Sequence, residues 1–230
     1  MMSLIEIYNY RVVSKYLPEF AWGLWATLWI SCLCLVLALV LGTLITVARR
    51  SRKRWLSAPV AIYVEAIRST PLLVQLYLVY YGLSQIPVLN IPVPALACGI
   101  FALTVHTAAY MSEIIRGGIE SVDRGQFEGA KAVGMTERQA MLHIIYPQAF
   151  ANIVPALLGQ TAVLIKDSSI LSFIAVFELL GAGLMVLSDR VMPVEAFLTA
   201  AFGYLLIYIL MLQLSSIAKR KLAGNTWRQR

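Results

Sequence analysis

Long stretches without a charged residue are the feature that most constrains how this chain can fold. Residues 21–48 form a run of 28 uncharged positions, and residues 69–112 form a second run of 44. An apolar run of about 20 residues is long enough to cross a bilayer as a helix. Only 13% of the residues are charged, whereas about a quarter are charged in a soluble domain. This composition excludes a soluble enzyme, a disordered chain and a disulfide scaffold, and it predicts an all-α membrane protein.

The net charge of +7 is compatible with nucleic-acid binding, but the positions of the basic residues argue against it. Five of the six residues at 49–54 are basic, and a second basic group lies at 219–230. Each group directly follows a long apolar run. Basic residues in such places hold a helix end on the cytoplasmic side of a membrane. We therefore expect a lipid bilayer, and no nucleic acid, as the partner of this surface.

The apolar segments predict a single transmembrane domain, residues 1–230, with five spans. Their approximate bounds are 21–48, 56–82, 95–118, 146–168 and 191–218. The basic groups place the ends of the first and last spans in the cytoplasm, so we predict the N-terminus outside and the C-terminus inside. A second crossing within 146–187 would reverse the C-terminal end. Residues 169–187 are therefore predicted to form a re-entrant or outer-surface helix, and 84–94 a short outer loop.

A polar, charge-balanced stretch, about 120–145, separates the third and fourth spans. Its apolar residues recur at helical spacing, which predicts two short helices joined at Gly134 outside the bilayer core. The stretch is long for a connector in a compact bundle. An apolar stripe beside charges is typical of a docking surface for a partner.

The same stretch carries a motif with fixed spacing. It reads Gly125-Gln126-Phe127-Glu128-Gly129-Ala130, then Gly134, then Ile144-Ile145-Tyr146-Pro147. This resembles the EAA loop of ABC importer permeases, with Gly129 in place of an alanine and Tyr146 in place of a leucine. The resemblance implies that one set of residues couples the chain to an ATPase: Gly125, Gln126, Glu128, Ala130, Gly134 and Pro147.

Further segments narrow the resemblance to the polar amino-acid uptake branch of that superfamily. They are residues 65–75, 108–119 and 166–169. The resemblance implies a type I ABC importer permease fold in the bacterial cytoplasmic (inner) membrane and import of a polar or charged L-amino acid. It also implies a second identical or homologous permease, two ATP-binding subunits and an external solute-binding protein.

The chain contains no Gly-x-x-x-x-Gly-Lys-Ser/Thr phosphate loop. We therefore expect it to bind no cofactor and to catalyse no reaction, with ATP and Mg²⁺ held by the partner subunits. No residues have the spacing of a metal site.

Ionisable residues inside spans mark functional positions by default. Glu65 and Arg68 are three residues apart, so on a helix they share a face. Proline disfavours a regular helix at Ser69-Thr70-Pro71, and the freed groups can face a cavity. We predict substrate contacts from Glu65, Arg68, Thr70 and Gln75. The alternative is a structural Glu65–Arg68 ion pair that locks the second span.

A second candidate site is Lys166-Asp167-Ser168-Ser169. Its cation, anion and hydroxyls can complement a zwitterion, with Lys166 on the carboxylate and Asp167 on the ammonium. The alternative is a span end among lipid headgroups. Glu113 and Arg116 form a predicted structural pair, and Glu178 is expected to cap or gate the outer segment.

Two other functions remain open from the residues alone. One is a secondary transporter driven by an ion gradient, which has no use for the large polar loop. The other is a structural permease subunit without its own substrate site. An intramembrane enzyme lacks any catalytic constellation in this sequence.

Overall fold

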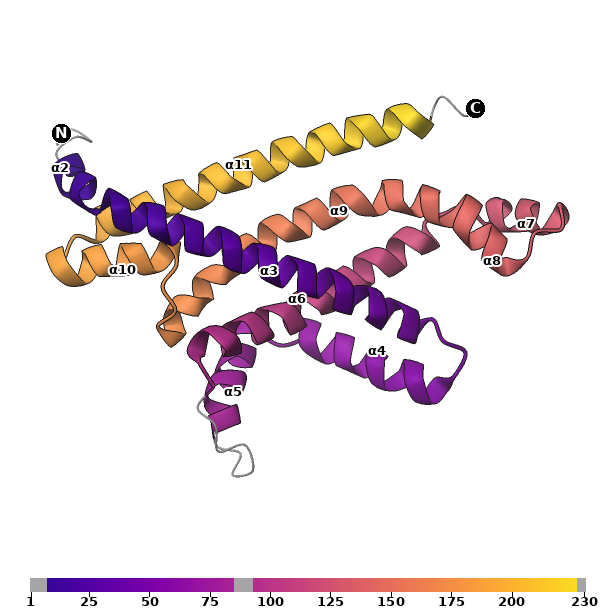
Figure 1. Cartoon of the computed structure of the whole chain (residues 1–230), viewed down its shortest axis with the longest axis horizontal. Helices are drawn as coiled ribbons and strands as arrows, with labels where there is room; N and C mark the ends of the chain where they lie inside the picture. Colours follow the sequence, from indigo (N-terminus) through magenta and orange to yellow (C-terminus); the bar gives the residue numbers. More distant parts are fainter. Residues whose placement is uncertain (1–7, 85–92, 227–230) are drawn as a thin grey trace.

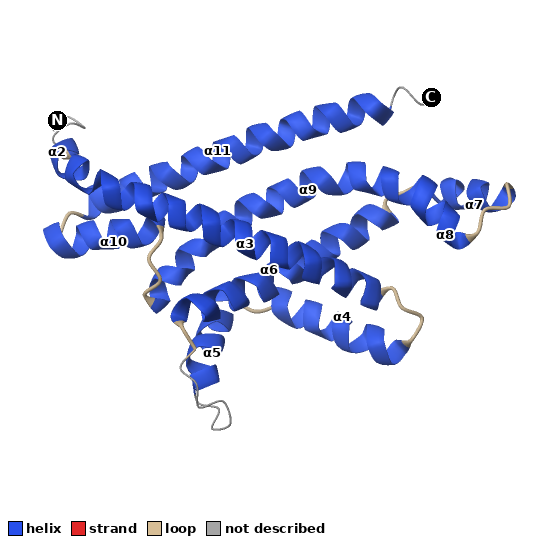
Figure 2. Ribbon diagram, in the orientation of Figure 1, coloured by secondary structure: helices blue, strands red, loops and turns tan. Residues whose placement is uncertain are grey.

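In the computed structural model, residues 8–84 and 93–226 are described, and the regular elements among them are all helical (Figures 1 and 2). The predicted outer loop falls mostly outside these residues, as does the end of the C-terminal basic group. The helices are α2 (Tyr10–Val13), η1 (Ser14–Tyr16), α3 (Leu17–Arg49), α4 (Arg54–Arg68), α5 (Leu72–Ser84), α6 (Ala95–Glu120), α7 (Arg124–Ala132), α8 (Glu137–Ala140), η2 (Met141–Ile145), α9 (Tyr146–Asp167), η3 (Ser168–Ile174), α10 (Leu179–Arg190) and α11 (Pro193–Thr226).

Four helical segments of the described chain are long and apolar enough to cross a membrane. They are Tyr10–Arg49, Ala95–Glu120, Glu137–Ile174 and Pro193–Arg220. They correspond to the first, third, fourth and fifth predicted spans. The chain is therefore a multi-pass helical membrane protein, as its composition predicts.

The second predicted span, 56–82, is not one helix. It consists of α4, which is amphipathic, and α5, a shorter apolar helix. The break falls at Ser69-Thr70-Pro71, where the sequence predicts it. Pro71 has no N–H to donate to the preceding turn and restricts Thr70, so a continuous helix is disfavoured there.

Helices α3 and α6 pack closely through small residues. The buried face of α3 carries Cys34, Ala38 and Gly42 at four-residue spacing. A Cβ atom added to Gly42 would lie 3.0 Å from the carbonyl oxygen of Ala108 on α6. Small residues let membrane helices approach this closely, and van der Waals packing then holds them together.

The segment predicted as re-entrant or outer-surface helix, 169–187, folds as η3 followed by α10. The chain turns between them at Ala175, which has a left-handed backbone with φ of 58°. Helix α10 packs through Leu179, Ala182 and Val186 against the beginnings of α3 and α11. It therefore covers the end of the bundle that also carries the N-terminus (Figure 1).

The opposite end of the bundle gathers the predicted cytoplasmic segments. Figure 1 places the α3–α4 connection, helices α7 and α8, and the C-terminal end of α11 toward the same end of the molecule. A groove lined by Arg50 and Glu137 confirms that the basic connection lies against the polar loop. The segments predicted to be cytoplasmic thus lie at one end of the molecule; which side of the membrane that end faces stays a prediction.

Candidate functional site: the coupling loop and the polar groups within the bundle

Helix α7 is the centre of the predicted coupling loop, and local chemistry fixes both of its ends. Asp123 caps the start, because its carboxylate accepts a hydrogen bond of 2.7 Å from the backbone N–H of Gly125. Gly134, with φ of +78°, ends the helix. The N–H groups of Gly134 and Met135 donate to the carbonyls of Lys131 and Ala130, both at 3.0 Å. This is a Schellman motif, which requires the glycine's left-handed backbone.

The second half of the loop starts a new helix immediately. Thr136 and Gln139 form a capping box, in which each side chain bonds the other residue's backbone N–H. The helix runs through a π turn, Met141–Ile145, into α9. Pro147 explains this turn, because its ring would clash with the carbonyl four residues earlier in a regular α-helix. The second of the two short predicted helices is thus continuous with α9 and forms the N-terminal end of the fourth span.

Two amide side chains fasten α7 and its approach to α9. Gln148 donates to the side chain of Gln126 at 3.1 Å, and Asn152 donates to the hydroxyl of Ser121 at 2.9 Å. Ala130 is buried against the body of the protein. Helix α7 is therefore joined to α9 by a side-chain hydrogen bond as well as by the connecting chain.

Helix α7 carries an exposed carboxylate. Glu128 is exposed and lines a hollow of about 510 Å³ between α7 and the ends of α3 and α6, together with Phe127 and Arg50. Val133, at the end of α7, is 75% exposed. An exposed carboxylate beside apolar side chains is suited to docking a protein partner.

The α4–α5 break is held together by Gln75. Its Nε2 donates to the carbonyl of Ile67 at 2.8 Å and to the hydroxyl of Thr70 at 2.7 Å. Its Oε1 accepts from Nδ1 of His106 on α6 at 2.9 Å. Gln75 and Thr70 therefore satisfy the backbone groups that Pro71 leaves unpaired, and they position the break against α6.

The predicted alternative of a Glu65–Arg68 ion pair is wrong for this structure. Arg68 instead reaches Glu113 on α6, with its NH1 atom 3.6 Å from Oε2. As the last residue of α4, its side chain extends past the helix toward α6, where it also lies over the Tyr110 ring at 5.6 Å. Glu65 is exposed and has no ion pair among the described residues.

Glu113 forms ion pairs with three arginines from three helices. Besides Arg68, it bonds Arg49 at the end of α3, and Arg116 on its own helix at 2.7 Å. Arg116 also pairs with Glu120 at 2.5 Å. The predicted Glu113–Arg116 pair is confirmed, but it belongs to a larger cluster with one excess positive charge. Arg68 is the most exposed of the three arginines, with 39% of its side chain exposed.

The Lys166–Ser169 group occupies the junction of α9 and η3. Lys166 is exposed, and its Nζ lies 5.0 Å from the centre of the Tyr208 ring on α11. Asp167 and Ser169 are half-buried. Ser168 is fully buried and donates to the carbonyl of Ile165 at 2.8 Å, so in this conformation its hydroxyl is a packing group.

The two predicted polar groups border one core cluster. Leu72, just after the helix break, and Leu164, just before Lys166, both pack into the cluster formed around Leu76 and Leu103. Among the described residues no hydrogen bond or ion pair joins the two groups directly. Both groups thus border the same core cluster, and the side chains of Arg68 and Lys166 are exposed on the surface of this single chain.

Sequence reasoning underestimated Glu178. It is completely buried and caps α10, accepting from the N–H groups of Leu180 and Gly181. Its carboxylate also accepts from hydroxyls of three other elements, namely Thr27, Ser172 and Tyr204. The predicted cap is confirmed, but the hydroxyl partners lie 6 to 151 residues away along the chain. No local pattern indicates them.

Among the described residues, no cluster of three or more His, Cys, Asp or Glu side chains could hold a metal ion. The Cys34 and Cys98 thiols are buried as packing groups. The polar chemistry of this part of the chain thus lies in the coupling loop and in the charged groups of the spans.

Comparison with known proteins decides the family. The protein-family model for the inner membrane component of binding-protein-dependent transport systems matches residues 37–224. The chain belongs to this family of transport permeases. The permease is 40% identical, over 172 residues, to the octopine transport system permease of Rhizobium meliloti, which covers 72% of this chain and 70% of that protein. It is 37% identical, over 187 residues, to a probable glutamine ABC transporter permease of Bacillus subtilis, with coverage of 81% and 85%.

Solved structures agree with the predicted fold. A crystal structure described as an amino acid ABC transporter with histidines matches with a TM-score of 0.89 at 34% identity, over 96% of this chain and 100% of that one. The methionine ABC transporter MetNI matches with a TM-score of 0.72 at 18% identity, which supports the fold alone. The permease therefore has the type I ABC importer fold. It is not itself an enzyme, because ATP hydrolysis in such systems belongs to separate ATP-binding subunits.

Proposed function

We propose that this permease forms the pathway by which an ATP-driven importer moves a polar or charged L-amino acid across the bacterial cytoplasmic membrane. The observation that carries the proposal is the coupling loop, in which exposed Glu128 lies on a short helix fastened to α9 through Gln126 and Gln148. Partner ATPases dock on this loop. A solute-binding protein delivers the amino acid at the end of the bundle covered by α10.

The chain pairs with a second permease, identical or homologous. Exposed charges support this, because Lys166 in the fourth span and Arg68 at the break between α4 and α5 would otherwise face lipid at considerable cost. A cavity between two permeases gives both side chains a polar environment. ATP-driven closure of the ATPases brings the two coupling loops together and switches this cavity between its inward and outward openings.

We assign the substrate contacts to the groups that remain exposed or half-exposed around this cavity. Arg68 and Lys166 bind the carboxylate, Asp167 and Glu65 bind ammonium groups, and Ser169 orients the ligand. Thr70 and Gln75 are positioning residues that keep the helix break in shape. The names of the relatives, which include octopine, glutamine and cystine permeases, support an amino-acid substrate.

Replacing Lys166 with Met tests this assignment. Loss of one charged hydrogen bond to a carboxylate reduces affinity about tenfold or more. We expect a decrease of that size in the uptake of the best substrate from a panel of labelled amino acids by the reconstituted complex. Lys219→Met, at the exposed end of α11, is the matched control. Unchanged uptake in Lys166→Met would mean that this group carries no substrate site.

A further inference from the structure

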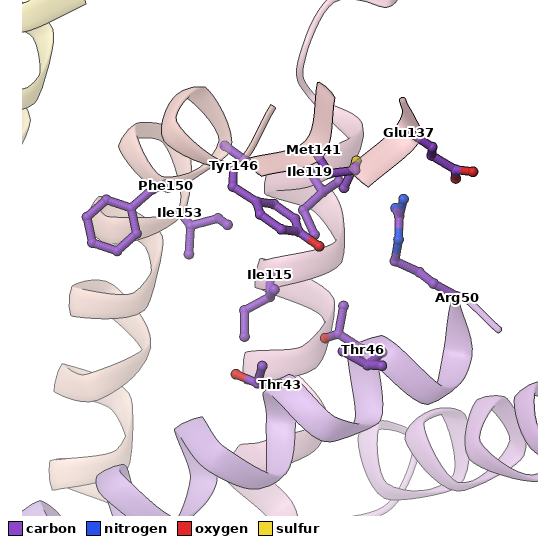
Figure 3. A pocket seen from close by; sticks show the side chains of 12 residues that line it. Thr43, Thr46, Arg50, Ile115, Ile119, Glu137, Met141, Tyr146, Phe150 and Ile153 are labelled. Atoms are coloured by element: carbon purple, nitrogen blue, oxygen red, sulfur yellow. The ribbon is translucent and has the colours of Figure 1, made fainter. Parts of the chain in front are cut away.

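A groove on the coupling-loop end of the bundle has no role in the proposed transport pathway. It has a volume of about 460 Å³ and lies between the end of α3, the end of α6 and the root of α9. Val47, Ile115 and Phe150 are among the side chains that make its walls largely apolar. Figure 3 shows Thr43 and Thr46 on one side and Tyr146 and Phe150 on another.

The mouth of the groove is basic. Arg50 lines it, and among the described residues its side chain makes no hydrogen bond and no ion pair. Arg49, its neighbour, is occupied by Glu113. Glu137 faces Arg50 across the mouth (Figure 3), but its closest cation is Arg52 at 4.0 Å, and both of those side chains are largely solvent-exposed. Arg52 thus offsets Glu137 and leaves the charge of Arg50 unpaired. Glu120 and Glu128 line the adjoining hollow with Arg50, but neither forms an ion pair with it among the described residues.

The groove lies at the depth where a membrane changes from acyl chains to headgroups. The apolar run of α3 ends at Arg49, and the basic connection 50–54 follows at once. Trp55, 73% exposed, lies next in the chain, and the Nζ of Lys53 lies 5.9 Å from its ring centre. Tryptophan and basic residues in this order are typical of the cytoplasmic membrane boundary. This step rests on the orientation in the proposed function.

We propose that this groove binds an anionic phospholipid of the inner leaflet. One acyl chain occupies the apolar part beside Ile115 and Phe150, and the phosphate is bound by Arg50, with Arg52 and Lys53 around it. Basic pockets between membrane helices on the cytoplasmic side are suited to such headgroups. A protein occupant would have to supply a carboxylate for Arg50, whereas a lipid phosphate brings this charge with it.

The site has a mechanical consequence. Met141 and Tyr146, at the two ends of the π turn between the coupling loop and α9, line the groove. A bound acyl chain fills the space between this turn and α3. The lipid therefore stiffens the root of α9, through which movement of the coupling loop reaches the bundle.

Native mass spectrometry of the assembled transporter tests the proposal. The complex is placed in nanodiscs with equal amounts of phosphatidylglycerol and phosphatidylcholine. It is then released from the nanodisc in the mass spectrometer, and the molecules of each lipid that stay bound to it are counted. We expect retention of phosphatidylglycerol to decrease about fivefold in Arg50→Gln, as expected for one basic contact. Thr43→Phe, which fills the groove without changing charge, decreases retention of both lipids.

Two control variants distinguish a specific lipid-binding site from non-specific attraction of anionic lipid to the basic surface. Arg54→Gln removes a charge from the same basic connection, and Leu44→Phe enlarges an exposed neighbour of Thr43; neither residue lines the groove. Both are expected to retain lipid like the unchanged protein. Equal retention in all five proteins would overturn the proposal. Efficient cross-linking of Thr43→Cys to a second permease would also overturn it, because the groove would then be a protein interface.

The readout distinguishes this proposal from the proposed function. Lipid retention requires no transport, so a complex that binds phosphatidylglycerol at Arg50 yet accumulates no amino acid would contradict only the importer assignment. A complex that accumulates amino acid normally but retains no lipid would contradict only the lipid site.

Discussion

Reversing the charge of Glu128 is expected to abolish coupled transport. In Glu128→Lys, ATP-dependent uptake by the reconstituted complex should decrease about 100-fold or more, because a like charge in a desolvated interface costs several kcal/mol. Glu128 is exposed on α7 and lines a hollow with Phe127, Arg124 and Arg50. The added cation would therefore meet both Arg124 and the docking ATPase. Uptake of labelled amino acid, together with co-purification of the ATPase, measures the effect.

The matched control for this change is Lys131→Glu. Lys131 is exposed on the same helix but lines neither hollow beside α7. It undergoes a charge reversal of the same size, and we expect uptake within about twofold of the unchanged complex, as for a surface charge. Equal losses in the two variants would show that the helix tolerates no charge change, and would remove the special role of Glu128.

The second large effect is expected from Glu178. In Glu178→Ala, the start of α10 loses its cap, and the hydroxyls of Thr27, Ser172 and Tyr204 lose their shared acceptor. Because the site is completely buried, water does not replace the carboxylate. We expect a loss of about 3–5 kcal/mol in stability, seen as a decrease of about 10 °C in the apparent melting temperature of the purified permease.

Asp189→Ala is the control for Glu178. Asp189 lies on the same helix, is exposed, and accepts one hydrogen bond, from Tyr16 at 3.2 Å. Its removal should change stability by less than about 1 kcal/mol. An unchanged melting temperature in Glu178→Ala would mean that the hydroxyl groups find other partners, and that Glu178 does not hold the four helices together.

The parts of the fold that sequence analysis predicted correctly are determined by local chemistry. Gly134 ends α7 because it adopts a left-handed backbone easily, and the break before α5 follows from Pro71. The length of the apolar runs predicts the four long apolar segments in the same way, since a span needs only enough apolar residues in succession. Each of these features depends on a few neighbouring residues.

The parts that sequence analysis missed depend on contacts between distant segments. Arg49 was assigned to the membrane boundary with its basic neighbours, yet it turns inward to Glu113, 64 residues later. Arg68 shares a helix with Glu65 but forms its ion pair with Glu113, across the interface with α6. Spacing along one helix cannot indicate which of several carboxylates a long arginine side chain reaches, because the packing of α3, α4 and α6 decides it.

The source of energy tests the central claim most directly. Labelled amino-acid uptake is measured in proteoliposomes that hold either this permease alone or the complex with its ATP-binding subunits and solute-binding protein. The proteoliposomes are given an ion gradient across the membrane, ATP inside, both or neither. We expect accumulation only in the complex and only with ATP, unaffected by collapse of the gradient. Gradient-driven accumulation by the permease alone, without any ATPase, would contradict the account.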